Sequence, residues 1–176
     1  MARYLDTIDL PISCDAAFDV LVDFSSTQRW DPSVVRAHRI GSGPIAAGAR
    51  FEVVVRVFGV ESTLEYTLVE AERPHRIVLR AEQGVLTSLD EISLAPRGAG
   101  VRVTYDARIE LSGIARVFDG LLNAWFQRSG ARSAEGLRRA YAVGAQASPS
   151  ASSASARSGI RARKRAHNRN VPANLR

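Results

Sequence analysis

The sequence is poor in the residues that build covalent or metal-based frameworks. It has one cysteine, Cys14, and three histidines among its 176 residues. A single cysteine cannot form an internal disulfide, and we expect Cys14 to be a small buried apolar residue. The histidines are isolated, and no Cys or His pair has the spacing of metal ligands. The sequence predicts no metal site, and it contains no P-loop, dinucleotide fingerprint or nucleophile elbow, so no cofactor is predicted.

Long apolar runs are also missing. No stretch approaches the roughly 18 consecutive apolar residues of a membrane span. The N-terminus, MARYLDTIDLP, carries acidic residues where a signal peptide has an unbroken apolar core. We therefore expect no transmembrane segment and a cytoplasmic protein. The apolar content of 45% and the charged content of 24% are those of a soluble globular domain.

Acidic residues are absent from the C-terminal stretch. Residues 146–176 hold six Arg, one Lys and no acid, whereas residues 1–145 hold 17 Arg and 18 acids. Ser and Ala alternate in this stretch without any aromatic residue, so it cannot bury enough apolar surface to offset the entropy of ordering. We predict one domain, 1–145, followed by a disordered basic tail, 146–176. The Arg-rich part, 157–169, could contact nucleic acid or another anionic surface weakly through charge alone, or be an unselected solvated tail.

The N-terminal part of the chain predicts one strand followed by two short helices. YLDTIDL places Ile8 and Leu10 two apart between polar residues, which is the period of a half-buried strand. SCDAAFDVLVDF predicts a short helix capped by Ser13 or Asp15, and SSTQRW predicts a second helical turn. That turn ends before Pro32, because the residue that precedes a proline is pushed out of the α region.

After Pro32 the sequence alternates apolar and polar residues. The turns GSGP, FGVE, ERPH, EQG and PRGAG separate six strands with short connections, which is typical of an antiparallel meander. The alternation assigns one apolar face to the core and leaves charged residues on the other face. It is broken at four positions, namely Val54, Phe58, Val69 and Val85.

From Ile114 the apolar period becomes helical. IARVFDGLLNAWFQRSGARSAEGLRRAYAVG predicts the longest helix of the chain, in which Gly130 and Gly136 indicate a bend or a close packing contact. One strand, two short helices, six strands and a long helix predict an α+β protein with two layers. A curved seven-stranded antiparallel sheet would wrap around the C-terminal helix, with the two short helices between strands one and two.

The same segments resemble a known superfamily. IDLPISCDAAFDVLVDFSSTQRWDPSV, GSGPIAAGARFEVVV, EAERPHRIVLR, LAPRGAGVRVTY and FQRSGARSAEGLRRA occur in an order similar to that of START-like, Bet v 1-like or polyketide cyclase/dehydrase proteins, also named SRPBCC proteins. The resemblance covers about residues 3–144. It implies a helix-grip fold with a cavity between the sheet and the long helix, lined mostly by apolar groups.

Carried onto this chain, the resemblance and the inward parity of the strands give a set of candidate ligand-binding residues. The apolar candidates are Trp30, Phe51, Val55, Leu64, Tyr66, Leu79, Phe118, Leu121 and Trp125. For each of them the alternative is plain core packing. Polar residues with inward parity are a stronger signal, because an unpaired buried hydroxyl costs about 1–3 kcal/mol. These residues are Ser62, Tyr66, Ser88, Asp90 and Tyr105.

Three functions remain open from the sequence. The first is binding of a small, largely apolar molecule of lipid, polyketide-like or aromatic type in the cavity. The second is a cyclase or dehydratase in which Asp90 or Tyr66 performs acid–base chemistry, with the pKa of Asp90 raised by desolvation. The alternative to a catalytic role is that Asp90 pairs with an Arg or points outward. The third is an interaction protein that docks through its basic tail.

Overall fold

The computed structural model describes residues 1–113 and 119–142. It contains seven strands, two α-helices and a 3-10 helix, η1. In chain order the elements are β1 (Ala2–Leu10), α1 (Cys14–Val22), η1 (Phe24–Arg29), β2 (Val34–Ile40), β3 (Arg50–Val57), β4 (Val60–Glu72), β5 (Arg76–Gln83), β6 (Leu86–Arg97), β7 (Gly100–Leu111) and α2 (Asp119–Ala142). The predicted tail, 146–176, and the predicted start of the long helix at Ile114 lie outside the described residues.

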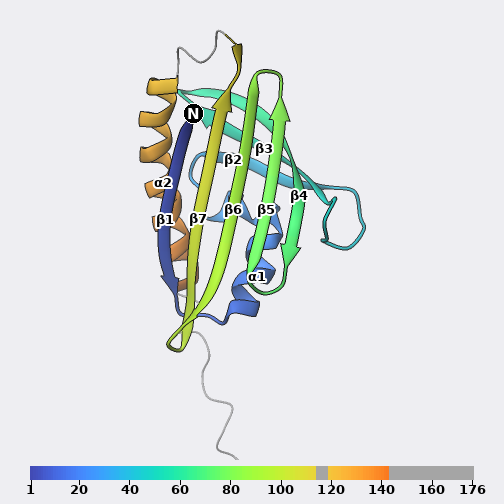
Figure 1. The fold of residues 1–176 in the computed structure, drawn as a ribbon, viewed down its shortest axis with the longest axis vertical. Coiled ribbons are helices and arrows are strands. Elements are labelled where there is room, and N and C mark those ends of the chain that lie inside the picture. The colour runs from blue at the N-terminus through green and yellow to red at the C-terminus, as the bar shows by residue number, and fades with distance from the viewer. Residues whose placement is uncertain (114–118, 143–176) are drawn as a thin grey trace, which may run out of the picture.

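All neighbouring strands are antiparallel, in the order β1-β7-β6-β5-β4-β3-β2 (Figure 1). Strands β2 to β7 form a meander of consecutive hairpins, because the short turns leave no room for a parallel crossover. The first strand, β1, then pairs with the last, β7. The predicted seven-stranded antiparallel sheet of an α+β protein is confirmed.

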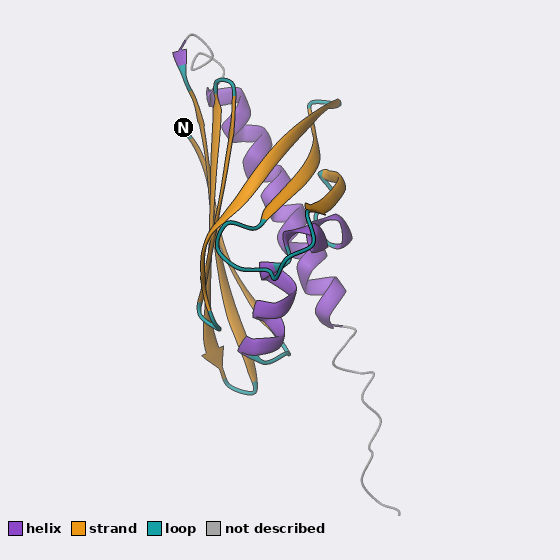
Figure 2. Cartoon of the chain, turned by 90° about the vertical axis from the view of Figure 1, so that its right-hand side faces the viewer, coloured by secondary structure: helices purple, strands orange, loops and turns teal. Residues whose placement is uncertain are grey.

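Both α-helices lie on the same side of the curved sheet (Figure 2). Helix α2 packs along β1, α1 contacts β5, β6 and β7, and η1 covers β2. The Ser13 hydroxyl accepts from the Ala16 amide at 3.2 Å, so Ser13 rather than Asp15 is the cap of α1. This arrangement is the helix-grip fold, with two short helices between the first two strands. Within the described ranges, none of the helices has the length and apolarity to cross a bilayer.

The predicted alternation builds the core. Most of the inward residues of the strands are buried, among them Leu68, Ile77 and Val103, each with no exposed surface. Val60 and Ser62, which follow the β3–β4 turn, have inward parity but are exposed.

Val69 is an apolar residue on the exposed side. It lies where β4 shifts register between Leu68 and Glu70, and this extra residue points outward. Val54 departs from the pattern in the other direction, since it is buried with outward parity.

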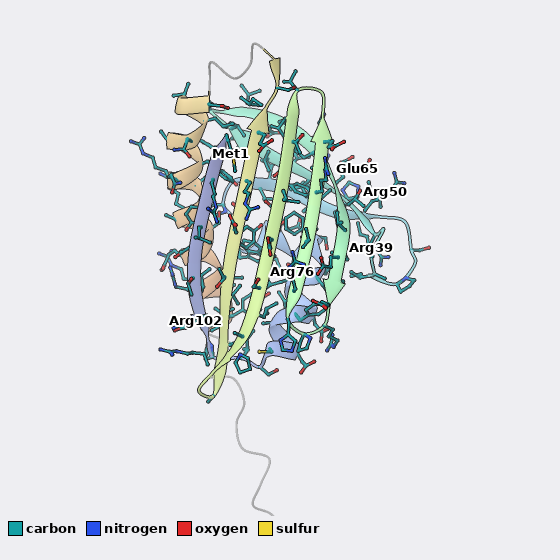
Figure 3. All side chains as sticks on the ribbon, in the orientation of Figure 1. Met1, Arg39, Arg50, Glu65, Arg76 and Arg102 are labelled. Atoms are coloured by element: carbon teal, nitrogen blue, oxygen red, sulfur yellow. The ribbon has the colours of Figure 1, made fainter. Side chains whose placement is uncertain are left out.

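Arginine side chains gather on the solvent face of the sheet and pair there with acids of neighbouring strands. Arg50 donates to Glu65 at 2.9 Å, and Arg102 donates to Asp9 at 2.8 Å. Figure 3 labels three of these cations, which belong to β3, β5 and β7, namely Arg50, Arg76 and Arg102. The opposite face, toward α2, carries the apolar residues of the same strands.

Two glycines of α2 set its distance from the rest of the protein. A Cβ at Gly136 would lie 1.9 Å from the Trp30 carbonyl oxygen, and one at Gly130 would lie 2.4 Å from the Tyr4 ring. Neither position tolerates a larger residue without movement, which explains why the helix carries glycine in its centre. The close packing predicted for Gly130 and Gly136 is therefore present, and it holds α2 against both β1 and the segment after η1.

Candidate functional site

A cavity of about 630 Å³ lies between the sheet and α2. Strands β1, β3, β4, β6 and β7 contribute to its wall, together with η1, the segment after it and one face of α2. Most of the wall is apolar, with residues such as Val53, Leu64, Ile109 and Leu137. The space between sheet and helix is therefore not filled by the side chains that surround it.

Ten of the thirteen candidate ligand-binding residues lie on the wall of this cavity. They are Trp30, Val55, Ser62, Leu64, Tyr66, Ser88, Asp90, Tyr105, Leu121 and Trp125. Strand parity accounts for the seven that lie on strands, because it depends only on the two-residue period of the sheet. Trp30 follows η1, and Leu121 and Trp125 belong to α2. The contact of these residues with a ligand remains a prediction.

Phe51 and Leu79 do not line the cavity, contrary to expectation. Both have the predicted inward parity, and both are fully buried in the main apolar core. Phe51 packs edge-on against Phe24 of η1, with ring centroids 6.4 Å apart. The short helices therefore fill part of the concave face, and side chains beneath them are core rather than wall. Phe118 lies outside the described residues.

The cavity has an apolar rim. Phe58, at the tip of the β3–β4 hairpin, is 53% exposed, and Leu121, in the first turns of α2, is 58% exposed, yet both line the cavity. The rings of Phe58 and Trp125 lie 6.0 Å apart. These residues mark the side on which the cavity meets solvent. In the sequence, Phe58 stands out only as a break in the alternation. The structure explains this break, because Phe58 lies in a turn with φ of 51°.

Trp30 forms a buried part of the cavity wall. Its side chain is 6% exposed, and its indole Nε1–H donates to the Ser26 hydroxyl at 3.3 Å. Its ring meets the ring of Tyr105 edge to face at 6.3 Å. The indole thus has the polar partner that burial requires, and it fixes the position of Tyr105.

The buried part of the wall carries a cluster of polar groups from three strands. The Tyr66 hydroxyl of β4 donates to Ser88 Oγ of β6 at 3.1 Å. The Tyr105 hydroxyl of β7 donates to Asp90 Oδ2 of β6 at 3.4 Å. Ser88 and Asp90 are 1% and 4% exposed, so these groups are shielded from bulk water. We refer to Tyr66, Ser88, Asp90 and Tyr105 as the polar cluster.

Burial dominates the ionisation of this cluster. It raises the pKa of Asp90 to about 7, although the nearby hydroxyls of Tyr105, Tyr66 and Ser88 act in the opposite direction. Burial, and next the charge of Asp90, raise the pKa of both Tyr66 and Tyr105 well above the usual value, so both phenols are protonated at neutral pH. Asp90 is therefore the group of the cluster that changes its charge near pH 7.

Asp31 is a cavity residue that sequence reasoning missed. It follows η1, and its Oδ1 accepts from the Ser33 amide at 2.8 Å and from the Ser33 hydroxyl at 2.7 Å. Burial raises its pKa. An Asp before a proline has the signature of a turn, and the sequence held no sign that this turn borders the cavity. Within residues 1–113 and 119–142, no group of three or more His, Cys, Asp or Glu side chains could hold a metal ion.

Family models and solved structures place the chain among known proteins. The family model described as "Polyketide cyclase / dehydrase and lipid transport" matches residues 1–142. A search of curated proteins gave no match. Among solved structures, a START superfamily protein from Mycobacterium smegmatis has a TM-score of 0.68 and 12% sequence identity over 81% of this chain and 99% of that chain.

Two further structures are similar. A protein from Thermus thermophilus has a TM-score of 0.66 at 16% identity, covering 81% of this chain and 97% of that chain. The Zhui aromatase/cyclase from a Streptomyces species has a TM-score of 0.60 at 17% identity, covering 81% of this chain and 97% of that chain. At these identities the likeness shows the fold alone. The match of the family model over residues 1–142, together with a helix-grip fold, shows that this protein belongs to the polyketide cyclase/dehydrase and lipid-transport family.

Proposed function

We propose that this protein binds a small, largely apolar molecule, of lipid, polyketide-like or aromatic type, in the cavity between the sheet and α2. The observation that carries the proposal is the cavity itself, about 630 Å³ in volume with a mostly apolar wall. Protein interiors are close-packed, and few of their voids exceed the size of a water molecule. A space this large falls within the roughly 300–1,000 Å³ of ligand pockets.

The distribution of side chains supports one orientation of the ligand. Apolar residues of the rim, such as Phe58 and Leu121, would contact its apolar body. The polar cluster at the buried part of the wall would receive a polar group, since a buried hydroxyl or carboxyl gains from a hydrogen-bonding partner. The description of the family, which names lipid transport beside polyketide chemistry, is in keeping with such a ligand.

Binding can be tested by reducing the space. Ala107 lines the cavity on β7, and Ala107→Phe would place a ring in it. We expect the affinity for the neutral probe pyrenemethanol, followed by its fluorescence, to fall about tenfold or more, since lost apolar burial of one ring is worth ~1.5–3 kcal/mol. The matched control is Ala95→Phe on the exposed side of β6, which should leave the affinity unchanged. Equal affinities of the two variants, both folded by their melting temperatures, would contradict the proposal.

A second experiment asks for the natural ligand. Native mass spectrometry of the purified full-length chain should show, besides the free protein, a species heavier by the mass of one small organic molecule. Ala107→Phe should reduce the fraction of this species, and Ala95→Phe should not. Extraction of the heavier species would then identify the compound.

A second candidate function is acid–base catalysis on a bound polyketide-like substrate. The observation that favours it is a shielded carboxyl, Asp90, with a pKa of about 7 beside the phenol of Tyr105. A general acid or base is most effective with a pKa near the operating pH. Under this proposal Asp90→Asn abolishes turnover and leaves the affinity for a neutral substrate analogue nearly unchanged. Loss of both in equal measure would argue for binding without catalysis.

A further inference from the structure

The charges on the wall of the cavity are of one sign. Among the described residues that line it, Asp31 and Asp90 carry carboxyl groups, and none is Arg, Lys or His. The arginines of the sheet instead lie on its solvent face in pairs with acids, as Arg50 and Arg102 do. A ligand in the cavity therefore meets two acidic groups and no cation.

Neither carboxyl has a charged partner. No ion pair joins Asp31 or Asp90 to any side chain in the described part of the chain. Asp90 is 4% exposed, and its hydrogen bond from Tyr105 reaches Oδ2 at the long distance of 3.4 Å. The hydroxyls of Tyr66 and Ser88 also lie near enough to this carboxyl to lower its pKa. Among the side-chain hydrogen bonds of the described residues, none ends on Oδ1 of Asp90, where a donor of the ligand would bind.

Among the described residues, the surroundings of Asp90 contain no cationic group that could neutralise it. The titratable groups near it are Tyr66 from β4, Tyr105 from β7 and Asp31 from the segment after η1. The paired residue of β5 is Leu79, and the cavity-lining residues of α2 are all uncharged. Buried charges in proteins are normally paired, because an isolated ion in an apolar environment costs several kcal/mol. A bound cation would provide the missing partner.

Building on the proposed function, we propose that the cavity selects apolar amines, with the ammonium group bound to Asp90 within reach of the second carboxyl, Asp31. The apolar body of the ligand points toward the rim at Trp125 and Phe58. Three N–H donors of an ammonium group can reach Asp90 Oδ1 and neighbouring hydroxyl oxygens together. When Asp90 is ionised, a ligand with a carboxylate in the same place would meet like charge and only hydroxyl donors of the polar cluster, so it should bind more weakly.

The ionisation of Asp90 gives this selectivity a dependence on pH with a definite sign. A cationic ligand binds the ionised carboxyl, so its affinity rises with pH as Asp90 loses its proton near pH 7. The rise continues until the amine itself is deprotonated, which for the primary amine of lysine occurs at about pH 10.4. A neutral alcohol of the same shape gains nothing from the ionisation and shows no such rise.

The test uses three fluorescent probes that share one apolar body, pyrenemethylamine, pyrenemethanol and pyrenecarboxylate, with the full-length protein at about pH 8. We expect the amine to bind about tenfold or more tightly than the alcohol, because hydrogen bonds to an ionised group are roughly twice as strong as those between neutral groups. The carboxylate should bind more weakly than either. Asp90→Asn should lower the affinity for the amine to that for the alcohol measured with the same variant.

The matched control is Asp106→Asn, which removes a buried carboxyl of β7 that pairs with Arg3 away from the cavity. It should leave all three affinities unchanged. If the alcohol binds but the amine binds no more tightly, or if Asp90→Asn leaves the amine affinity intact, the selectivity for amines is overturned while the cavity remains a binding site. If none of the three probes binds, the proposed function itself fails, and the selectivity fails with it.

Discussion

At the scale of single residues, two aspartates show how position decides the effect of a charge. Asp9 lies on the solvent face, where a hydrogen bond from Arg102 lowers its pKa. Asp90 lies on the cavity wall, where burial raises its pKa to about 7. The stability due to Asp9 is present above its unfolded pKa and is lost as the pH falls. For Asp90 the sign is reversed, because the folded state holds the proton more tightly than the unfolded state between about pH 4 and pH 7.

Asp90→Asn should therefore stabilise the ligand-free protein at high pH. The raised pKa costs stability as the pH rises from about 4 to about 7, and each pH unit contributes at most about 1.4 kcal/mol. We expect the variant to gain about 1–3 kcal/mol in the free energy of unfolding at about pH 8 and nothing at about pH 4. Urea denaturation at the two pH values measures these free energies of unfolding. The control is Asp9→Asn, which should lose stability at the higher pH. A gain for Asp90→Asn that is equal at both pH values would contradict a raised pKa for Asp90.

Strand parity favours an inward position for Asp90, with an outward orientation or pairing with an Arg as the alternatives, and it does not specify the partners of Asp90. Its inward position follows from the two-residue period of β6, with Ser88 and Ile92 on the same face. That Tyr105 lies within reach depends on the register between β6 and β7, which a single sequence does not specify. Asp31 could not be found at all, because its role depends on where the turn after η1 meets α2.

At the scale of elements, α2 depends on glycine for its contact with the segment after η1. Gly136→Ala would place a Cβ 1.9 Å from the Trp30 carbonyl oxygen, which is backbone and cannot rotate away. We expect a loss of about 1–3 kcal/mol in the free energy of unfolding, as for overpacked sites, despite the better helix propensity of alanine. Thermal and urea denaturation measure it.

Gly120 provides the matched control in the same helix. A Cβ at this position meets nothing within 4 Å. Gly120→Ala should therefore stabilise the protein by up to about 1 kcal/mol through helix propensity alone. If Gly136→Ala proves as stable as Gly120→Ala, the close approach of α2 to Trp30 is not a feature of the protein in solution.

The helices and strands were largely predictable from the sequence, but the local departures from regular strand alternation were not. Alternation between turns predicted β2 to β7, and the helical period after Leu111 predicted α2. The register shift at Val69 has no signature in the sequence, because a bulge inserts one residue without changing composition. Phe51 and Leu79 were assigned to the cavity wall because parity distinguishes inward from outward, but not wall from core beneath a helix.

At the scale of the whole molecule, the charge is divided along the chain. Residues 1–145 hold nearly equal numbers of Arg and acids, whereas 146–176 hold only basic charges. Deletion of 146–176 should abolish a salt-sensitive association with nonspecific DNA and leave pyrenemethanol binding unchanged. Fluorescence anisotropy of labelled DNA over a salt series measures the first effect. Equal DNA binding by the full-length and truncated chains would show that the tail has no such role.

The pairing of β1 with β7 joins the first strand of the chain to the last. On the ribosome β1 leaves the exit tunnel first, yet it has no partner until β7 has been synthesised. The other neighbours in the sheet are consecutive strands and can pair as they emerge. Because α2 packs along β1, docking of the helix must wait for the same event. Pairing of β1 with β7 closes a loop that includes most of the domain. This strand pair therefore has the largest entropic cost of loop closure in the sheet and forms late in assembly.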